Sequence, residues 1–362
     1  MAEVRRLFPR RMRRFVLIGV AALVLPVAAS AESAERSASQ MVRSVAEQML
    51  LDAAKDTATA RARCWLRAKM VSDDDLSCYG LKLSDGWQEF DAGQPIVVVV
   101  HGFNSSPRKN QAMLSAIRAA DHPCGTFAYP NDYTIPASAQ LLSCELRRFG
   151  REHPERRFAL VCHSMGGMVA RACVEDSLYD PGNVERLILI APPTRGSSIA
   201  YFAVGTDVWE HWLARRTGGP WRRVRDSIVD GLGEAADELR PGSEFLDELN
   251  SRPRNPRVEY SIILGSGARM SEAEMNWIRE SVVGKLAEVP GAERGAKRLD
   301  QLLADMDELV TGKGDGVVAV KRGRLDGVDD TLVIPFGHLS VTGEAKSDAV
   351  RRVQQAVLER LN

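Results

Sequence analysis

Three nearly continuous apolar runs constrain the fold of this chain more than any other feature of its sequence. They lie at 95–100 (PIVVVV), 157–162 (RFALVC) and 184–191 (VERLILIA). A strand with one solvated face alternates polar and apolar residues, whereas a strand of a parallel sheet is covered on both faces and is apolar almost throughout. The runs therefore predict a mostly parallel sheet with helices on both faces.

Helical patterns separate these runs, and the alternation continues to the end of the chain. Further short strands are predicted at 125–130, 257–265 and 331–336. Helices are predicted at 138–153, from Met165 to Tyr179, and near the C-terminus, where one stripe holds Val350, Val353, Val357 and Leu361. Strands that alternate with helices are typical of the α/β class.

The first 31 residues have the features of a secretory signal. A basic segment is followed by an apolar stretch of 15 residues, and Ala29-Ser30-Ala31 offers a cleavage site after Ala31. Because a membrane-spanning helix needs about 20 residues, we expect export to the periplasm or secretion. The alternative is a protein anchored in the membrane by an uncleaved signal.

The remaining chain is expected to form an N-terminal helical extension at 32–76 and one larger domain at 77–362. Two helical, lid-like insertions are expected in this domain, at about 198–256 and 266–312. Without the signal, 42 basic residues stand against 47 acidic ones, so nothing in the charge predicts binding to nucleic acid.

The run at 157–162 ends in an abrupt corner. Cys162-His163-Ser164-Met165-Gly166-Gly167 leads directly into a helical pattern. A serine at such a corner has strained backbone that needs small neighbours, and the N–H groups of a helix N-terminus stabilise developing negative charge. The segment resembles the nucleophile elbow, G-x-S-x-G, of the α/β-hydrolase superfamily, with Cys162 replacing the first glycine.

Five further segments resemble this superfamily in the expected order. They are HGFNSS (101–106), which resembles the oxyanion segment of lipases; APPTRGSS (191–198); ELRPGSEFLDELN (238–250), which resembles a helix of bacterial lipases and of the glycolipid-remodelling hydrolase group; and GDGVV (314–318) and FGHLSV (336–341), which resemble the acid and histidine loops. The resemblance covers about residues 90–345. It implies an α/β-hydrolase fold with insertions after the family's sixth and seventh strands.

Ser164 is the expected nucleophile, and a serine needs a base to take its proton. Of the six histidines, His338 directly follows a predicted strand near the C-terminus, as the chain order serine, acid, histidine requires. His163 is expected to point away from the serine. Asp315 is preferred as the acid because it lies 23 residues before His338 and matches the family's pattern. Glu272 is the reserve candidate.

The resulting hypothesis is a serine ester hydrolase of the lipase or carboxylesterase class. Backbone N–H groups of Phe103 and Met165 would form the oxyanion hole, and the substrate would be a small-molecule or lipid acyl ester. Thioesters and phospholipid acyl esters are alternatives, because the pocket walls set the substrate. A non-catalytic binding protein with the same fold is another. No motif for a cofactor or a metal is present, so none is expected.

The first insertion contains three of the six tryptophans, Trp209, Trp212 and Trp221. They favour either a lid over an acyl pocket or a helix packed on the sheet. The basic segment 221–226 is more typical of a solvated helix face, and peripheral contact with anionic lipid is the alternative. The six cysteines leave Cys64–Cys78 and Cys124–Cys144 open as local disulfides. Cys162 and Cys173 are expected to be small buried apolar residues.

Overall fold

The predicted sheet is present in a computed structural model, which describes residues 79–103, 105–130, 134–198, 200, 237–288, 293–342 and 347–362. Within these ranges seven strands form one sheet in the order β1-β3-β2-β4-β5-β6-β7. Their bounds are β1 Gly80–Leu83, β2 Ile96–Val100, β3 Cys124–Ala128, β4 Phe158–His163, β5 Val184–Ile190, β6 Glu259–Gly265 and β7 Thr331–Ile334. All neighbouring pairs are parallel except β1 with β3, which is antiparallel.

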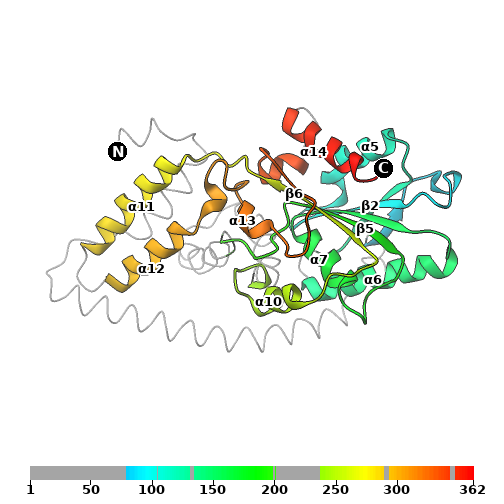
Figure 1. Ribbon diagram of the computed structural model, residues 1–362, viewed down its shortest axis with the longest axis horizontal. Coiled ribbons are helices and arrows are strands. Elements are labelled where there is room, and N and C mark those ends of the chain that lie inside the picture. The colour runs from blue at the N-terminus through cyan, green and yellow to red at the C-terminus, as the bar shows by residue number, and fades with distance from the viewer. Residues whose placement is uncertain are drawn as a thin grey trace, which may run out of the picture. The chain divides into compact units, whose positions relative to one another are not determined.

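Helices cover both faces of the sheet (Figure 1). On one face lie α6 (Ile135–Glu152) and α7 (Met165–Val174), and on the other lie α5 (Gln111–Ala119) and α14 (Asp348–Glu359). Each central strand supplies apolar side chains to both layers, since successive residues of a strand point to opposite faces. This is why the runs are apolar over most of their length, as the sequence predicts.

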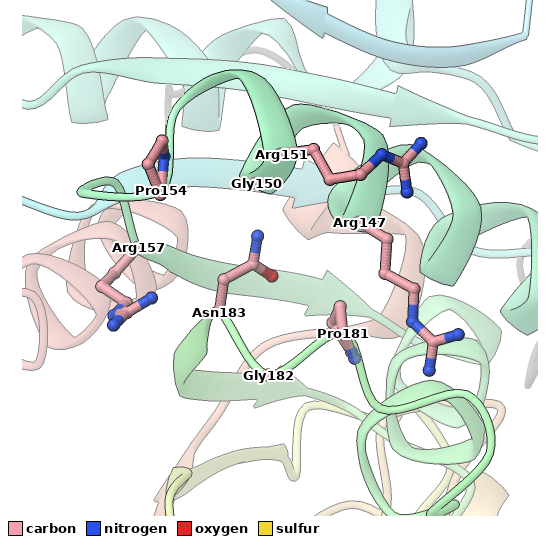
Figure 2. Close-up of a pocket in the computed structure, with 8 residues that line it drawn as sticks. All are labelled: Arg147, Gly150, Arg151, Pro154, Arg157, Pro181, Gly182 and Asn183. Carbon is pink, nitrogen blue, oxygen red and sulfur yellow. The ribbon is translucent and has the colours of Figure 1, made fainter.

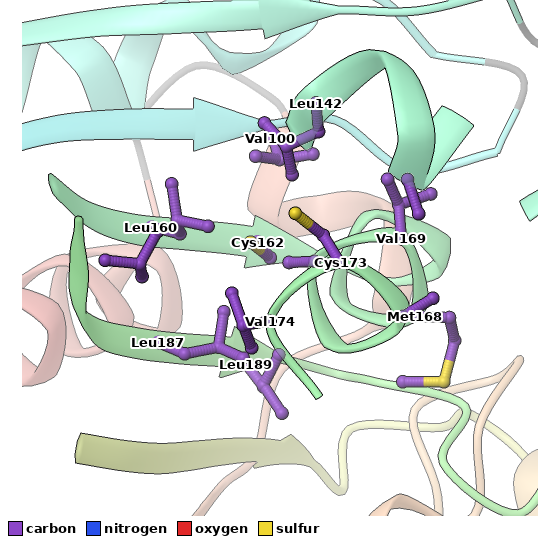
Figure 3. Packing of buried hydrophobic residues seen from close by; sticks show 14 of the residues in the cluster. Val100, Leu142, Leu160, Cys162, Met168, Val169, Cys173, Val174, Leu187 and Leu189 are labelled. Carbon is purple, nitrogen blue, oxygen red and sulfur yellow. The ribbon is translucent and has the colours of Figure 1, made fainter. Parts of the chain in front are cut away.

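Strand β2 illustrates this division. Val98 and Val100 belong to the apolar cluster that includes residues of α6 and α7, whereas Val97 and Val99 belong to the cluster on the other face. Figure 3 shows the first cluster, where Val100, Leu160 and Leu187 from adjacent strands meet side chains of both helices. The core is therefore two apolar layers separated by the sheet, and it fixes β4 and α7 firmly.

The remaining described elements lie mostly after β5. They are α10 Glu244–Ser251, α11 Glu272–Ala287, α12 Glu293–Ala304, α13 Val320–Gly323 and the 3₁₀ turns Trp87–Glu89, Pro107–Asn110, Asp307–Leu309 and His338–Thr342. Cys78–Trp277 and Gln301–Asn362 form one compact unit, and Ile278–Asp300 belongs to a second. Within the second, Arg279 and Asp300 form an ion pair at 2.5 Å.

The six predicted strands are confirmed, and three details differ. The antiparallel edge strand β1 and helix α5 were not predicted; β1 has only four residues, too few to show a period. The helix that begins at Met165 ends at Val174 and not at Tyr179. It ends there because the Asp176 carboxylate accepts the Leu178 N–H, a local bond that replaces the helical one.

The disulfide that the sequence left open between Cys124 and Cys144 is not formed, and both thiols are free. Cys124 packs in the layer of α5 and α14, whereas Cys144 is exposed on α6, on the other face of the sheet. Cys162 and Cys173 are buried in the core, as expected. Burial raises the pKa of both thiols. Cys64 and Cys78 lie outside the described residues.

Several sequence predictions fall on residues that the structure does not describe: the signal at 1–31, the extension at 32–76 and Trp209, Trp212 and Trp221 with the basic segment 221–226. The described part of the first insertion includes α10, and α11 and α12 lie within the second. In the described ranges, no helix combines the length and the apolar character needed to cross a membrane.

Candidate active site

Ser164 occupies the corner between β4 and α7. Its φ is 55° and its ψ is −127°, a conformation that non-glycine residues rarely adopt. Packing of the core layers on both sides of β4 holds the corner in place, and the Ser164 N–H donates to the Ile190 carbonyl at 2.9 Å. The strained backbone predicted from the sequence is therefore present at this serine.

Small residues surround the corner because other backbone comes very close. A Cβ atom on Gly166 would lie 2.4 Å from the His101 carbonyl oxygen, and one on Gly102 would lie 2.9 Å from the Ser164 Cβ. Neither space admits a side chain. The turn after β2 and the start of α7 therefore enclose Ser164 from two sides.

His338 meets Ser164 from the far end of the chain. It begins the 3₁₀ turn His338–Thr342, four residues after the end of β7, and its Nε2 lies 2.9 Å from the Ser164 Oγ. Strands β4 and β7 are not neighbours, but their carboxyl ends lie on the same edge of the sheet. The serine and the imidazole are both more than nine-tenths buried.

Asp315 completes a continuous chain of hydrogen bonds. Its Oδ2 lies 2.8 Å from the His338 Nδ1, while its Oδ1 accepts the N–H groups of Val317 and Val318 at 2.9 and 2.7 Å. The His338 N–H in turn donates to the Asp315 carbonyl at 2.9 Å. Because the carboxylate can only accept, the Nδ1 of His338 carries the proton and its Nε2 is free to accept from the serine.

Two backbone N–H groups close to Ser164 have no hydrogen-bond acceptor in the part of the chain that the structure describes. They belong to Phe103, in the turn after β2, and to Met165, the first residue of α7. Buried backbone N–H groups are paired in the great majority of cases. Two unpaired N–H groups beside a serine hydroxyl are donors that could stabilise a negatively charged oxygen.

Comparison with known proteins supports the same architecture. Residues 139–217 match the model of the PGAP1-like alpha/beta domain family. The lipase BlEst2 of Bacillus licheniformis, in its mature form, is similar at 19% identity and a TM-score of 0.50, over 77% of this chain and 97% of that chain. Its propeptide form is similar at 18% identity and a TM-score of 0.51, over 77% and 53%.

The chain has the α/β-hydrolase fold. At such low identities the structural likeness shows the fold alone, and no curated protein sequence matches the chain. The predicted fold class, with its mostly parallel sheet and its helices on both faces, is confirmed.

The reserve candidate and two acids of the loop before β7 lie at the protein surface. Glu272, the reserve candidate, is exposed and pairs with Lys313 at 2.6 Å. Asp326 pairs with Arg195, and Asp330 pairs with Arg360. Of the acids considered from sequence, Asp315 is the one that lies beside His338.

Sequence reasoning missed the role of His163 in the packing of this site. Its ring is buried and lies against the ring of His338, with 4.8 Å between the ring centroids. Burial, together with the neighbouring His338, lowers the pKa of His163 to about 3. The alternation of β4 places His163 on the other side of the strand from Cys162, but it could not show which side chain would return to meet it.

Sequence reasoning also missed a set of buried hydrogen bonds around Glu308. Glu308 has no solvent exposure; its carboxylate accepts the Ser198 N–H at 2.9 Å and its carbonyl accepts the Gly316 N–H at 2.7 Å. The Ser197 hydroxyl donates to the Val317 carbonyl at 2.5 Å. The segment after β5 thereby holds the loop that carries Asp315. In the ranges that the structure describes, no cluster of histidine, cysteine or acidic side chains is suited to a metal ion.

Proposed function

We propose that this α/β-hydrolase is a serine hydrolase that cleaves carboxylic ester bonds through an acyl-enzyme. The observation that carries the proposal is the unbroken chain of hydrogen bonds from Ser164 through His338 to Asp315. A serine hydroxyl is a weak nucleophile unless a base takes its proton. Here the base is His338, whose Nε2 contacts the Ser164 hydroxyl in the tautomer that can accept its proton. His338 is buried together with Ser164 and Asp315.

The reaction would proceed in two steps. His338 takes the Ser164 proton as the Oγ attacks the acyl carbonyl, and it then gives that proton to the leaving alcohol. Asp315 stabilises the imidazolium that forms in between. The N–H groups of Phe103 and Met165 would hold the negatively charged oxygen. Water, activated by the same histidine, then releases the acid.

For the substrate we propose a lipid or small-molecule acyl ester, in the lipase or carboxylesterase class. The similar Bacillus protein is described as a lipase, and the two proteins share the fold. Rates on p-nitrophenyl esters of increasing acyl length, measured beside a thioester and a phospholipid, would define the class. Faster cleavage of the thioester or of the phospholipid would replace the carboxylic ester assignment.

The nucleophile is tested by labelling the protein with a fluorophosphonate and measuring esterase activity in Ser164→Ala. We expect an adduct on Ser164 in the wild type and a loss of roughly 10⁶ in kcat in the variant, by analogy with subtilisin. Ser251→Ala, at the exposed end of α10, is the matched control and should keep full activity. An unlabelled wild type that cleaves no ester would refute the proposal and favour a binding protein.

We also propose that the protein is exported, on the basis of the signal-like residues 1–31. Mass spectrometry of the protein recovered from its producing cells should find Glu32 as the first residue. A mature protein that keeps the apolar stretch would indicate the membrane-anchored alternative.

A further inference from the structure

The turn that follows β2 is held by two buried aromatic side chains, His101 and Tyr129. Their rings stack with 4.3 Å between centroids and an angle of 4° between planes. The Tyr129 hydroxyl donates to the His101 carbonyl at 2.7 Å, and the Tyr129 N–H donates to the His101 Nε2 at 3.4 Å. Both residues are almost completely buried. Since β3 pairs directly with β2, Tyr129 reaches the turn from the neighbouring strand.

The two bonds to the His101 ring require the same tautomer. The His101 Nδ1 lies 3.0 Å from the Gly102 carbonyl oxygen, which can only accept, so Nδ1 carries the proton. Its Nε2 must then accept, and the Tyr129 N–H is a donor. Burial lowers the pKa of His101, and the charge of Lys109 adds to this effect although the bond to Gly102 opposes it. The ring is therefore kept neutral with its proton on Nδ1.

The bond to the Gly102 carbonyl also sets the direction of the next N–H group. Gly102 and Phe103 share one peptide bond, and the described part of the chain contains no cis peptide bond. In a trans peptide the C=O and the N–H point in opposite directions. While the Gly102 oxygen is held toward the His101 ring, the Phe103 N–H must point away from that ring.

Ser164 lies close to the same peptide, since a Cβ on Gly102 would be 2.9 Å from its Cβ. We propose that His101 is a positioning residue that aims the Phe103 N–H at the oxygen of the bound acyl group, by holding the Gly102 carbonyl on the opposite side. The inference rests on the proposed function, because it gives the Phe103 N–H a role in that reaction. Tyr129 supports it by fixing both the His101 carbonyl and the tautomer of its ring.

Three substitutions of His101 separate this role from simple packing. His101→Asn keeps an amide donor near the position of Nδ1, His101→Gln places its amide near the position of Nε2, and His101→Phe keeps only the stacked ring. Removing one donor of an oxyanion hole costs about 10²–10³ in kcat. We expect kcat on a p-nitrophenyl ester to fall by about 10² in the Gln and Phe variants, but by less than about 10-fold in the Asn variant. KM should stay within a factor of about three in all of them, because the interaction strengthens only in the transition state.

Thermal unfolding of each variant is the second measurement. A purely structural role predicts that kcat per folded protein is unchanged, or that activity follows stability and not the retained donor. Equal kcat values for His101→Asn and His101→Gln would overturn the proposal, and this comparison remains usable if the Phe variant does not fold. If the wild type is active and His101→Phe keeps its kcat, the positioning role of His101 is refuted and the proposed function stands. A wild type that forms no fluorophosphonate adduct and cleaves no ester refutes the proposed function instead.

Discussion

The polar side chains near the two ends of strand β4 differ in burial and in charge. Near its carboxyl end, Ser164 and His338 are buried and joined by a hydrogen bond. At its amino end, an open pocket of about 390 Å³ is lined by Arg147, Arg151 and Arg157 around Asn183. Figure 2 shows the three guanidinium groups pointing in different directions. A strand of six residues spans about 20 Å, so the two ends are well separated.

The comparison shows that a concentration of charge and a convergence of polar atoms are separate features of this sheet. The arginines at the amino end are exposed, and Arg147 is engaged with the carbonyls of Leu178 and Asp180. The carboxyl end has fewer charges, but its polar atoms converge and are shielded from water. Electrostatic interactions are stronger where water is excluded, and groups already in place need no reorganisation during reaction.

After the loss of the Ser164 hydroxyl itself, the largest effect is expected where the hydrogen bonds from Ser164 through His338 are interrupted at Asp315. Asp315→Asn preserves the shape of the side chain but can present an N–H to the His338 Nδ1, which favours the wrong tautomer. We expect kcat to fall by roughly 10⁴, as in serine proteases with this substitution. Steady-state ester hydrolysis measures the change, with Asp326→Asn at the surface as the control. A kcat for Asp315→Asn within threefold of the wild type would remove Asp315 from the mechanism.

Much of this end of the sheet could be predicted from the sequence because its signals are local. The apolar runs indicated which strands are buried, and the small residues around Ser164 indicated the sharp turn between β4 and α7. Asp315 and His338 were found from their order along the chain and from the resemblance to a family. Their distances from each other depend on the packing of strands far apart in the sequence, which no local pattern contains.

The contacts that could not be predicted are those made between segments with no shared period. Three such contacts join residues more than 25 positions apart. They are the ring contact of His163 with His338, the hydrogen bond of Glu308 with Ser198 and the hydrogen bond of Tyr129 with His101. The disulfide considered between Cys124 and Cys144 is not formed for a related reason. Twenty residues allow a bridge in a flexible chain, but β3 and α6 place these thiols on opposite faces.

A smaller effect is expected from the burial of His163, and it concerns stability. In the unfolded chain its pKa returns to about 6.5, whereas in the folded protein it is about 3. Between these values the unfolded state binds a proton that the folded state does not, so the free energy of unfolding falls as the pH falls. Where the unfolded state binds this one proton and the folded state does not, the free energy of unfolding changes by about 1.4 kcal/mol per pH unit.

Urea unfolding at pH 7, 6, 5 and 4 tests this expectation in the wild type and in His163→Phe, which keeps a ring but cannot take up a proton. The variant should lose less stability than the wild type as the pH falls from 6 to 4. Parallel curves for the two proteins would show that His163 takes up its proton equally in both states, and that its burial has no effect on pH stability.

The smallest effect is expected at the amino end of β4, where charge is abundant but does not converge. Arg151→Gln and Arg157→Gln remove exposed guanidinium groups for which the described part of the chain offers no ion pair. Surface substitutions of this kind usually change stability by less than about 0.5 kcal/mol, and neither group lies near the Ser164 edge of the sheet. We therefore expect kcat within about twofold of the wild type, measured on the same ester as Asp315→Asn. A tenfold loss in either variant would show that the two ends of the sheet are coupled, and that the reactive edge depends on charge about 20 Å away.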